Sequence, residues 1–403
     1  MNYILIKKCQ ICNKDLKKFI NLNKQPLCDD LLKKPNKNIF YKLKVKICTN
    51  CLTAFQVYNI NKSRLFPKKY HYRSANTKDV LLGMKDLVNK IEKKKNLKNK
   101  TVLDIGCNDG SLLDIFKKKG AVTFGIEPTN AYLEAEKKGH KVYNKYFNLN
   151  LSKILKKRLK KIDIITFTNV FAHIEDFKDL IESLKKLISK ETLIVIENHY
   201  LKEVIKKNQF DTFYHEHPRT YSLKSFYEVA KLLKVKITDF NYVKRYNGNI
   251  RVFLNMEKKK NSKLEKNLKL EKKIIIKYKL LQKKIEKWKK NKKKELINIV
   301  KKNGPLPAKA FPGRASILIN LLELNDGIIS NIYEKDSSLK INHYAPGTNI
   351  KILKERLLKD KNIKNGVMIN FAWHISKEIK NYVKKQLNFN GKIVDIISKK
   401  DFK

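Results

Sequence analysis

The segment at residues 210–217, with the sequence FDTFYHEH, concentrates groups that can transfer protons. Four consecutive residues supply a phenol, two imidazoles and a carboxylate: Tyr214, His215, Glu216 and His217. Packing does not require such a run, and histidine is the natural proton acceptor at neutral pH. The segment therefore predicts acid–base chemistry, although His215 also fits a structural role. A metal site is the weaker interpretation, because Glu216 has no helical His-x-x-x-His pair around it.

A second polar group, Asn169 and His173, comes directly after the apolar run IDIITF at 162–167. If that run is a parallel strand, both side chains lie at the carboxyl edge of the sheet, where ligands bind in such folds. The plainer alternative for His173 is that it caps a helix.

A D-x-G-x-x-x-G motif spans residues 104–110, between an apolar run and the amphipathic SLLDIF. Its two glycines let the backbone approach a ligand closely, and the start of the following helix supplies free N–H groups. Glu127 comes 21 residues after Gly106, where an acid can accept hydrogen bonds from both hydroxyls of a ribose. The motif predicts a site for a nucleoside-containing cofactor, and a glycine turn without a ligand is the weaker interpretation.

The residues inside this loop select the kind of cofactor. A dinucleotide site prefers glycine where this chain has Asn108, and Asp109 would repel a phosphate. S-adenosyl-L-methionine (SAM) has no phosphate but has positive amino and sulfonium groups, which an acidic loop suits. We therefore predict a SAM site formed by six residues: Asp104, Gly106, Asn108, Gly110, Glu127 and Asn169.

Two CxxC pairs, separated by 35 residues, offer four thiols: Cys9, Cys12, Cys48 and Cys51. Two such turns can fill a tetrahedral Zn(II) site with no open position, which makes the site structural. The ion would stabilise a lysine-rich segment that has little core of its own. A redox role is the weaker interpretation, because redox CxxC motifs normally come singly near a βαβ unit. Cys28 and Cys107 have no partner at this spacing and are expected to be ordinary thiols.

The elements that must position these motifs divide the chain into four parts. Residues 1–76 hold five of the six cysteines and are predicted to form a zinc-binding domain. Residues 77–255 alternate apolar runs with amphipathic stretches, which predicts a doubly wound α/β domain with a parallel sheet. The strands are expected at 102–106, 122–127, 162–167 and 192–197, and a helix at 176–188.

Residues 256–303 predict a connecting amphipathic helix, because apolar residues recur at steps of three and four from Ile274 to Trp288. A connector packed on a neighbouring domain is favoured over a nucleic-acid or membrane helix. Residues 304–403 are a second α/β stretch, with strands expected at IISNIY, VMINFAW and KIVDII.

The composition is that of a folded protein of several domains: 403 residues, 42% hydrophobic and 10% aromatic. Lys and Arg number 91 against 38 acidic residues, but only eight are Arg, the residue that reads phosphates and bases in two-pronged contacts. Because the lysines are spread over every segment, a solvated surface is favoured over a nucleic-acid footprint. With no apolar run of membrane length and no secretory leader, we expect a cytoplasmic, monomeric protein without a membrane partner.

These motifs together resemble the sugar C-methyltransferases that act on nucleotide-linked 4-keto-deoxysugars. The resemblance covers nearly the whole chain. It rests on the paired CxxC, QPL at 25–27, YHYRS at 70–74, DIGCNDGSLL, GIEP, NVFAHI and FDTFYHEH. It departs from the family at 310–315, where AFPGRA stands in place of a glycine-rich G-A-x-x-K-G turn.

The resemblance implies a zinc-binding N-terminal domain, a central class I (Rossmann-like) SAM methyltransferase domain and a second Rossmann-like domain at the C-terminus. It implies that a base removes a hydrogen from the sugar carbon beside the ketone, and that the resulting carbanion takes the methyl group. By similarity, His217 is the base and Glu216 sets its tautomer or basicity, while Tyr214 and Tyr72 steady the enolate or relay protons. Asn169 and His173 match further active-site positions.

Two other functions remain as alternatives. A SAM-dependent RNA methyltransferase would also combine zinc knuckles with a basic surface, but the lysines show no interleaved aromatics for stacking bases. We therefore do not expect nucleic acid as the partner. A non-catalytic sugar-nucleotide-binding protein is the third possibility, and the retention of Tyr214, Glu216 and His217 argues against it.

Overall fold

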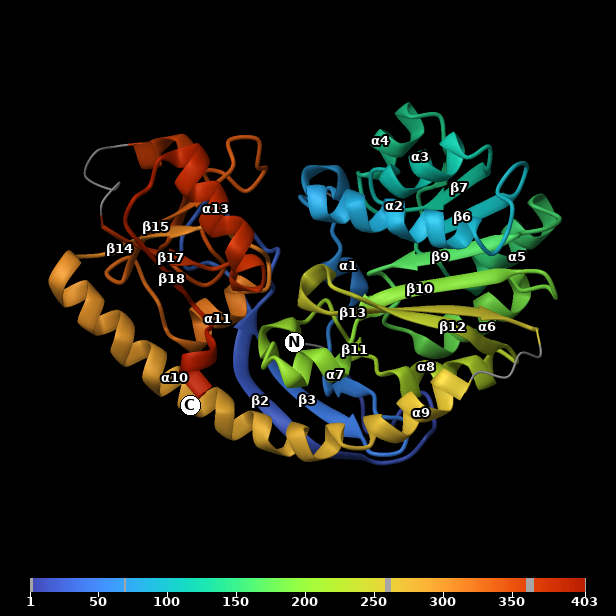
Figure 1. The fold of residues 1–403 in the computed structure, drawn as a ribbon, viewed down its shortest axis with the longest axis horizontal. Coiled ribbons are helices and arrows are strands. Elements are labelled where there is room, and N and C mark those ends of the chain that lie inside the picture. The colour runs from blue at the N-terminus through green and yellow to red at the C-terminus, as the bar shows by residue number, and fades with distance from the viewer. Residues whose placement is uncertain (1–2, 69, 258–261, 360–365, 403) are drawn as a thin grey trace.

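The computed structural model describes residues 3–68, 70–257, 262–359 and 366–402, and Figure 1 shows their arrangement. A seven-stranded sheet and a five-stranded sheet lie at the two ends of the molecule, with a four-stranded antiparallel sheet between them. Among the described residues, no helix combines the length and the apolar character that crossing a membrane requires.

The middle sheet contains most of the predicted zinc-binding block. Its order is β11-β4-β3-β2, with bounds β2 (Leu16–Pro26), β3 (Phe40–Cys48), β4 (Ala54–Gln56) and β11 (Arg219–Thr220). The short strands β1 (Ile4–Leu5) and β5 (Tyr58–Asn59) pair beside it, and α1 (Lys62–Leu65) follows. Because β11 comes directly after His217, the first 76 residues share their sheet with the segment that carries the expected base.

The large sheet has the order β12-β13-β10-β9-β6-β7-β8. The bounds are β6 (Thr101–Ile105), β7 (Val122–Ile126), β8 (Lys141–Tyr143), β9 (Ile164–Thr168), β10 (Leu193–His199), β12 (Lys236–Val243) and β13 (Asn249–Asn255). Strands β8, β7, β6, β9 and β10 run parallel, and β13 runs antiparallel to both of its neighbours. The four predicted strands are present within one or two residues, as is the predicted helix, α6 (Phe177–Leu187).

Helices cover both faces of this sheet. Val102, Ile164 and Val195 pack toward α2 (Lys78–Glu92) and α3 (Ser111–Lys118). The next residues along two of these strands, Leu103 and Ile165, pack on the other face with α5 (Leu149–Arg158), α6 and α8 (Leu223–Leu232). Side chains alternate across a strand, so a strand buried on both faces reads as a continuous apolar run. The predicted doubly wound α/β class is confirmed. The remaining helices here are α4 (Tyr132–Lys137) and α7 (Leu201–Lys206).

The C-terminal sheet is parallel throughout, in the order β16-β15-β14-β17-β18. Its bounds are β14 (Leu306–Lys309), β15 (Ile329–Glu334), β16 (Lys351–Lys354), β17 (Val367–Asn370) and β18 (Lys392–Asp395). The helices α11 (Ala315–Leu321) and α13 (Ser376–Leu387) belong to this part. The expected second Rossmann-like unit is present, and the order of its strands places β14 at the centre.

The predicted connector forms α9 (Ser262–Glu271) and α10 (Ile274–Asn303), while its residues 258–261 lie outside the described part of the chain. The apolar face of α10 is buried, as its spacing predicts. Tyr278 donates a hydrogen bond to the carbonyl of Val45 in β3, and Trp288 donates one to the carbonyl of Ile396 after β18. The helix therefore packs on both neighbouring sheets, and Figure 1 shows it along their outer side. The four-part division of the chain stays a prediction, because one apolar core joins the middle and C-terminal sheets.

Short 3-10 turns complete the fold, and three of them border the site described below. Their bounds are η1 (Ser74–Asn76), η2 (Phe210–Thr212), η3 (Arg245–Asn247), η4 (Glu355–Lys359), η5 (Trp373–Ile375) and η6 (Lys399–Phe402). Tyr246 within η3 has a left-handed backbone with φ of 50°, which a bulky residue rarely adopts. Such positions concentrate at functional sites.

Candidate active site and zinc centre

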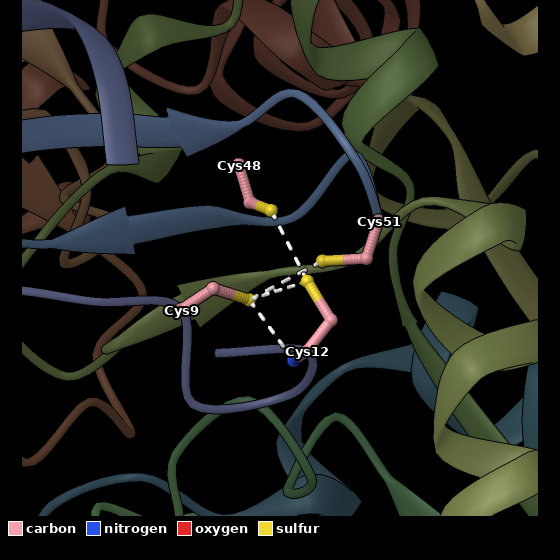
Figure 2. A group of neighbouring side chains, drawn as sticks. All are labelled: Cys9, Cys12, Cys48 and Cys51. Carbon is pink, nitrogen blue, oxygen red and sulfur yellow. Dashed lines mark hydrogen bonds between the residues drawn. The ribbon is translucent and has the colours of Figure 1, made fainter. Parts of the chain in front are cut away.

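The four predicted zinc ligands converge, as Figure 2 shows. The sulfur atoms of Cys9, Cys12, Cys48 and Cys51 all lie within 4.8 Å of one another. The Sγ–Sγ distances from Cys9 to Cys51 and from Cys12 to Cys48 are 3.4 and 3.5 Å. Four sulfurs at about 2.3 Å from a tetrahedral Zn(II) would be about 3.8 Å apart, so the cluster fits this ion with little adjustment.

The remaining cysteines stay outside this centre. Cys28 is fully buried, and Cys107 packs against Gly125 in β7, where an added Cβ would come within 2.5 Å of its sulfur. Within the described ranges, the cysteine cluster is the group found able to hold a metal ion. The weaker interpretation of residues 214–217 as a metal site thus gains no support.

The predicted SAM loop, residues 104–110, leaves β6 and enters α3 through a turn with three residues of positive φ. Gly106 and Gly110 both have positive φ, 75° and 76°, and Asn108 between them has φ of 50°. Glycine adopts this conformation at little cost, and asparagine is among the few other residues that tolerate it. A Cβ at Gly106 would come within 2.5 Å of a methyl group of Val170, so the loop packs directly against the end of β9.

Each acid of this region is paired within the protein. Both oxygens of Glu127 accept hydrogen bonds, one from the backbone of Asn108 at 3.0 Å and one from the backbone and hydroxyl of Thr129 at 2.9 and 2.6 Å. Asp104 accepts one from the hydroxyl of Thr166 at 2.6 Å. Burial raises the pKa of Asp104 to about 7 and also raises the pKa of Glu127, against the effect of these donors.

A segment of the zinc-binding block closes over the loop. The backbone N–H of Ser74 donates to the Asn108 side chain at 2.9 Å, and that of Ala75 donates to Asp109 at 2.8 Å. The Asn108 amide donates to the carbonyl of Tyr72 at 3.2 Å. The segment that includes Tyr72 is therefore fixed to the predicted cofactor loop by three hydrogen bonds.

Asn169 lies at the carboxyl end of β9, one residue before Val170, which packs against Gly106 of the loop. It follows β9, has φ of 57°, and accepts a hydrogen bond from Asn249 of β13 at 3.0 Å. Asn249 also donates to Glu197 at 3.1 Å, and Glu197 forms a fully buried ion pair with Arg251 at 2.8 Å. The amide nitrogen of Asn169 is buried without a hydrogen-bond partner among the described residues. This donor is therefore free to bind a ligand at the edge of the sheet.

The hydrogen bonding of His217 fixes its tautomer. Its Nδ1 lies 2.9 Å from the carbonyl oxygen of Thr212. Because a carbonyl only accepts, Nδ1 carries the hydrogen, and in the neutral ring Nε2 carries the lone pair. Sequence reasoning assigned this orienting role to Glu216, and the structure gives it to the backbone of Thr212 instead.

Other rings surround His217 closely. The ring centroids of Tyr214, His173 and His199 lie 4.1, 4.7 and 5.3 Å from its own. We call these four residues the histidine cluster. Burial lowers the pKa of His217 well below its usual range, and the neighbouring His173 and His199 lower it further. His217 is therefore neutral near pH 7, with Nε2 able to accept a proton.

The remaining predicted residues take different places around the cluster. His173 donates from Nδ1 to the carbonyl of Glu216 at 2.5 Å. His215 packs against Tyr41 of β3, with ring centroids 5.9 Å apart, which agrees with the structural role left open for it. The Tyr72 hydroxyl lies 3.3 Å from that of Tyr246, and Tyr72 itself is 38% exposed.

Glu216 is fully surrounded by protein, and neither carboxyl oxygen makes a hydrogen bond of normal geometry with a described residue. Burial raises its pKa to about 8, and repulsion from Asp29 adds to the rise. This carboxyl group is therefore protonated over much of the neutral range.

The middle sheet holds the segment 214–217 from behind. The Gln56 side chain in β4 donates to the carbonyls of Tyr214 and His217, the latter at 2.9 Å. The β4–β11 pairing and a hydrogen bond between the hydroxyls of Thr53 and Ser225 at 2.7 Å continue this contact. These contacts join the block that carries the four cysteines to the segment that carries the predicted base.

Sequence reasoning missed five residues of this site. They are Gln56, His199, Thr212, Tyr246 and Asn249. Only His199 gave a usable signal, because it ends the apolar strand TLIVIENH at the same sheet edge as Asn169. The others come to the site through contacts between segments far apart in the chain or through backbone atoms.

The residues of the loop fit SAM. Asp104, Asp109 and Glu127 supply acidic groups for a cationic ligand, and the free amide of Asn169 adds a donor. The four-cysteine cluster fits zinc by its donor set and spacing.

Comparison with known protein families matches three consecutive parts of the chain. Residues 9–66 match the model described as "Putative zinc binding domain", residues 77–233 the model "Methyltransferase domain", and residues 245–397 the model "C-methyltransferase C-terminal domain". These parts follow the predicted order of zinc-binding, central and C-terminal domains.

Individual proteins give further similarity. The C-methyltransferase NovU of Streptomyces niveus is 25% identical over 254 residues, 62% of this chain and 60% of NovU. The ubiquinone biosynthesis O-methyltransferase of Coxiella burnetii is 30% identical over 102 residues, 24% of this chain and 43% of that protein. The chain thus matches less than two thirds of the length of either relative. The magnesium protoporphyrin IX methyltransferase ChlM from Synechocystis PCC 6803, solved with bound SAH, is 14% identical, with a TM-score of 0.34 over 44% of this chain and 82% of that one.

Proposed function

The chain belongs to the C-methyltransferase family whose zinc-binding, methyltransferase and C-terminal domains it carries, and from that premise we propose its reaction. It methylates the carbon beside the ketone of a nucleotide-linked 4-keto-deoxysugar. The methyl donor is SAM, and the zinc ion is structural. A cytoplasmic location agrees with this assignment, because the four clustered thiols must stay reduced to bind zinc.

Bound SAM would supply an electrophilic methyl group on a positively charged sulfur. The residues that would hold it are Asp104, Asn108 and Glu127 with the amide of Asn169, at the carboxyl ends of β6, β7 and β9. Glu127 accepts from backbone donors and Asp104 from the hydroxyl of Thr166, so accommodating the ribose and the amino group requires exchange of some of these hydrogen bonds. Gly106 and Gly110 keep the loop backbone close to the sheet.

The central step is removal of a proton from carbon. Nε2 of His217 is the acceptor, because Thr212 holds the hydrogen on Nδ1. As the C–H bond breaks, its electron pair moves into the carbonyl group of the substrate, and negative charge develops on the ketone oxygen. A well-placed general base is typically worth about 10²- to 10⁴-fold in rate. The carbanion is then ready to take the methyl group.

Tyr214 is suited to stabilise the developing oxyanion. Its ring lies 4.1 Å from that of His217, and burial raises its pKa well above 10, so its hydroxyl remains a hydrogen-bond donor at the working pH. Tyr72, whose hydroxyl meets that of Tyr246, would relay protons toward the exposed side. His173 lies beside the base and is positioned by the backbone carbonyl of Glu216, and Asn169 lies at the same edge of the sheet, at the end of β9.

The observation that carries this proposal is the Nδ1 hydrogen bond of His217, which leaves a lone pair on Nε2 within a group of buried rings. The test is exchange of solvent deuterium into the sugar carbon beside the ketone, with a nucleotide-linked 4-keto sugar and no methyl donor. We expect exchange with the intact chain and none with His217→Asn. His343→Asn is the matched control, because His343 makes its own hydrogen bond to Ile341 and is not part of the histidine cluster. Absence of exchange in the intact chain would contradict the proposal.

A further inference from the structure

Arg314 is a buried cation with an unused hydrogen-bonding edge. Only 7% of its surface is exposed. Its Nε and Nη2 donate to the two carboxyl oxygens of Asp211 at 2.8 and 2.6 Å, and Nη2 also reaches Gln209 at 3.3 Å. Nη1 is buried and has no hydrogen-bond partner among the described residues. The guanidinium thus links the C-terminal part to η2, and the two N–H groups of Nη1 can still donate to a ligand.

Two histidines have unpaired nitrogens in the same region. Nδ1 of His199 and Nδ1 of His374 are both buried without a hydrogen-bond partner in the part of the chain that the structure describes. Among neighbouring charges, that of Arg314 is the strongest influence on both imidazoles, and together with burial it lowers the pKa of each well below its usual range. The three side chains therefore lie within electrostatic reach of one another.

Contacts around Asp211 explain how these groups meet. The indole N–H of Trp373 donates to the same Asp211 oxygen as Arg314, at 2.8 Å, and His374 is the next residue. The turn η5, which includes both, packs against η3. Tyr246 of η3 in turn lies 5.4 Å from His199, measured between ring centroids. These contacts bring Arg314 and His374 into the region of His199, a member of the histidine cluster, at the junction of the large sheet and the C-terminal sheet.

An oxyanion would satisfy this arrangement. A buried donor without a partner costs roughly 1–3 kcal/mol, and more when it is charged, so such groups are normally paired with something. A guanidinium edge and two imidazoles from three different elements match an acceptor with several oxygens, and the Arg edge matches phosphate in particular. The net charge of +53 would also attract an anion to the molecule.

We propose that Arg314, His199 and His374 bind a phosphate group of the substrate, so that the C-terminal part grips the anionic end while His217 acts on carbon. This inference rests on the proposed function for the position of the reacting carbon. It assigns a role in substrate binding to Arg314, which lies in the segment 310–315 where the sequence departs from the family, and to His374, which lies outside that segment.

Calorimetric titration of the full chain with inorganic pyrophosphate tests the proposal. We expect binding to the intact chain and at least tenfold weaker binding to His374→Asn and Arg314→Gln, with SAM affinity unchanged. Lys309→Gln is the matched control, because Lys309 is also a buried cation, paired with Glu355 in the same C-terminal part. It should bind pyrophosphate as the intact chain does.

His374→Asn is the decisive variant, since removing Arg314 leaves Asp211 buried and without its ion pair, which threatens the fold. Unchanged pyrophosphate affinity in His374→Asn, or no binding by the intact chain at millimolar concentration, would overturn the proposal. A nucleoside diphosphate that competes with pyrophosphate in the intact chain but not in His374→Asn would support the substrate as the source of the phosphate. Because this assay needs no ketone and no methyl transfer, its outcome is independent of the deuterium exchange that tests the proposed function.

Discussion

The predicted cofactor loop and the histidine cluster lie at one sheet edge, yet they differ in how many of their polar atoms are hydrogen-bonded. In the loop, Asn108, Asp109 and Glu127 all hydrogen-bond to nearby backbone or side-chain groups. Around the histidine cluster, the described residues leave Nδ1 of His199, the amide nitrogen of Asn169 and both oxygens of Glu216 buried and without a hydrogen bond of normal geometry.

This difference distinguishes the part of the site that the protein's own hydrogen bonds already hold in shape from the part that has unpaired groups available for a substrate. A loop whose acids are already paired keeps its shape and must exchange hydrogen bonds to take a ligand. A group of buried, unpaired donors and acceptors pays a free-energy penalty that a bound molecule can relieve. Substitutions in the two regions should therefore have separable effects, and the following experiments test that separation.

The largest effect is expected for His217→Asn. We expect the rate constant of methyl transfer to fall by about 10²- to 10⁴-fold, because the general base is lost, while the affinity for SAM stays the same. In the intact chain, the low pKa of His217 keeps it neutral, so the rate should stay level as pH falls to 6.5 and decline only at lower pH. Kinetics across a pH series, with titration of SAM, would check both statements. A decline that begins above pH 6.5 would contradict them.

Glu216→Gln should change the pH dependence of stability. The folded-state pKa of about 8 lies above the ordinary value near 4.5, so the protonated carboxyl stabilises the fold most below pH 4.5, and this contribution is lost as pH rises toward 8. Glutamine does not titrate. The free energy of unfolding of the variant should therefore rise relative to that of the intact chain by on the order of 2–4 kcal/mol between pH 5 and 8. Denaturant unfolding at both pH values measures this, and a constant difference would show that Glu216 is ionised in the fold.

Glu127→Gln should affect the predicted cofactor loop and leave the histidine cluster unchanged. The amide has one oxygen where the carboxylate has two, and its NH₂ group faces a backbone N–H instead of accepting from it. We expect the affinity for SAM to fall by roughly 10- to 100-fold, as for the loss of a hydrogen bond to a charged group. Deuterium exchange at the sugar carbon should persist. If the variant lost both deuterium exchange and SAM binding, the functions of the two regions would not be separable.

The smallest effect is expected for Gln56→Ala. Two hydrogen bonds to the carbonyls of Tyr214 and His217 are lost, worth about 1 kcal/mol each, so kcat should fall roughly 5- to 30-fold through poorer positioning of the base. The KM for SAM should not change. Gln25→Ala is the matched control, since Gln25 is also buried in the middle sheet but its side chain donates to the carbonyl of Leu22, away from the segment 214–217. Equal losses in both variants would indicate a general effect on folding.

Much of this site could be predicted because its signals are local. The zinc ligands follow from two CxxC turns, and the SAM loop follows from glycines placed where the backbone must have positive φ. The strands could be predicted because a strand buried on both faces needs an unbroken apolar run. In each case the signal itself, a CxxC turn, a glycine turn or a strand, is short, so the spacing of residue types is enough to predict it.

The hydrogen-bond partner of the His217 ring could not be predicted, for a physical reason. By similarity, Glu216 was expected to set the tautomer or basicity of this ring. The acceptor at Nδ1 is the backbone carbonyl of Thr212, which any residue at that position supplies. Backbone acceptors leave no mark on residue type. Their use depends on the 3-10 turn η2 that points this carbonyl toward the ring.

By itself, the sequence determined the α/β fold class and predicted the cysteine cluster and the segment that carries the proposed base, because short-range sterics, hydrophobic periodicity and ligand chemistry leave local patterns of residue types. Only the tertiary structure decided that β11 joins the sheet of the zinc-binding block and that Arg314 and His374 come to the region of His199. These contacts join residues more than one hundred positions apart in the sequence. They arise when separate apolar faces pack into shared cores, and no local pattern records which polar groups that packing brings together.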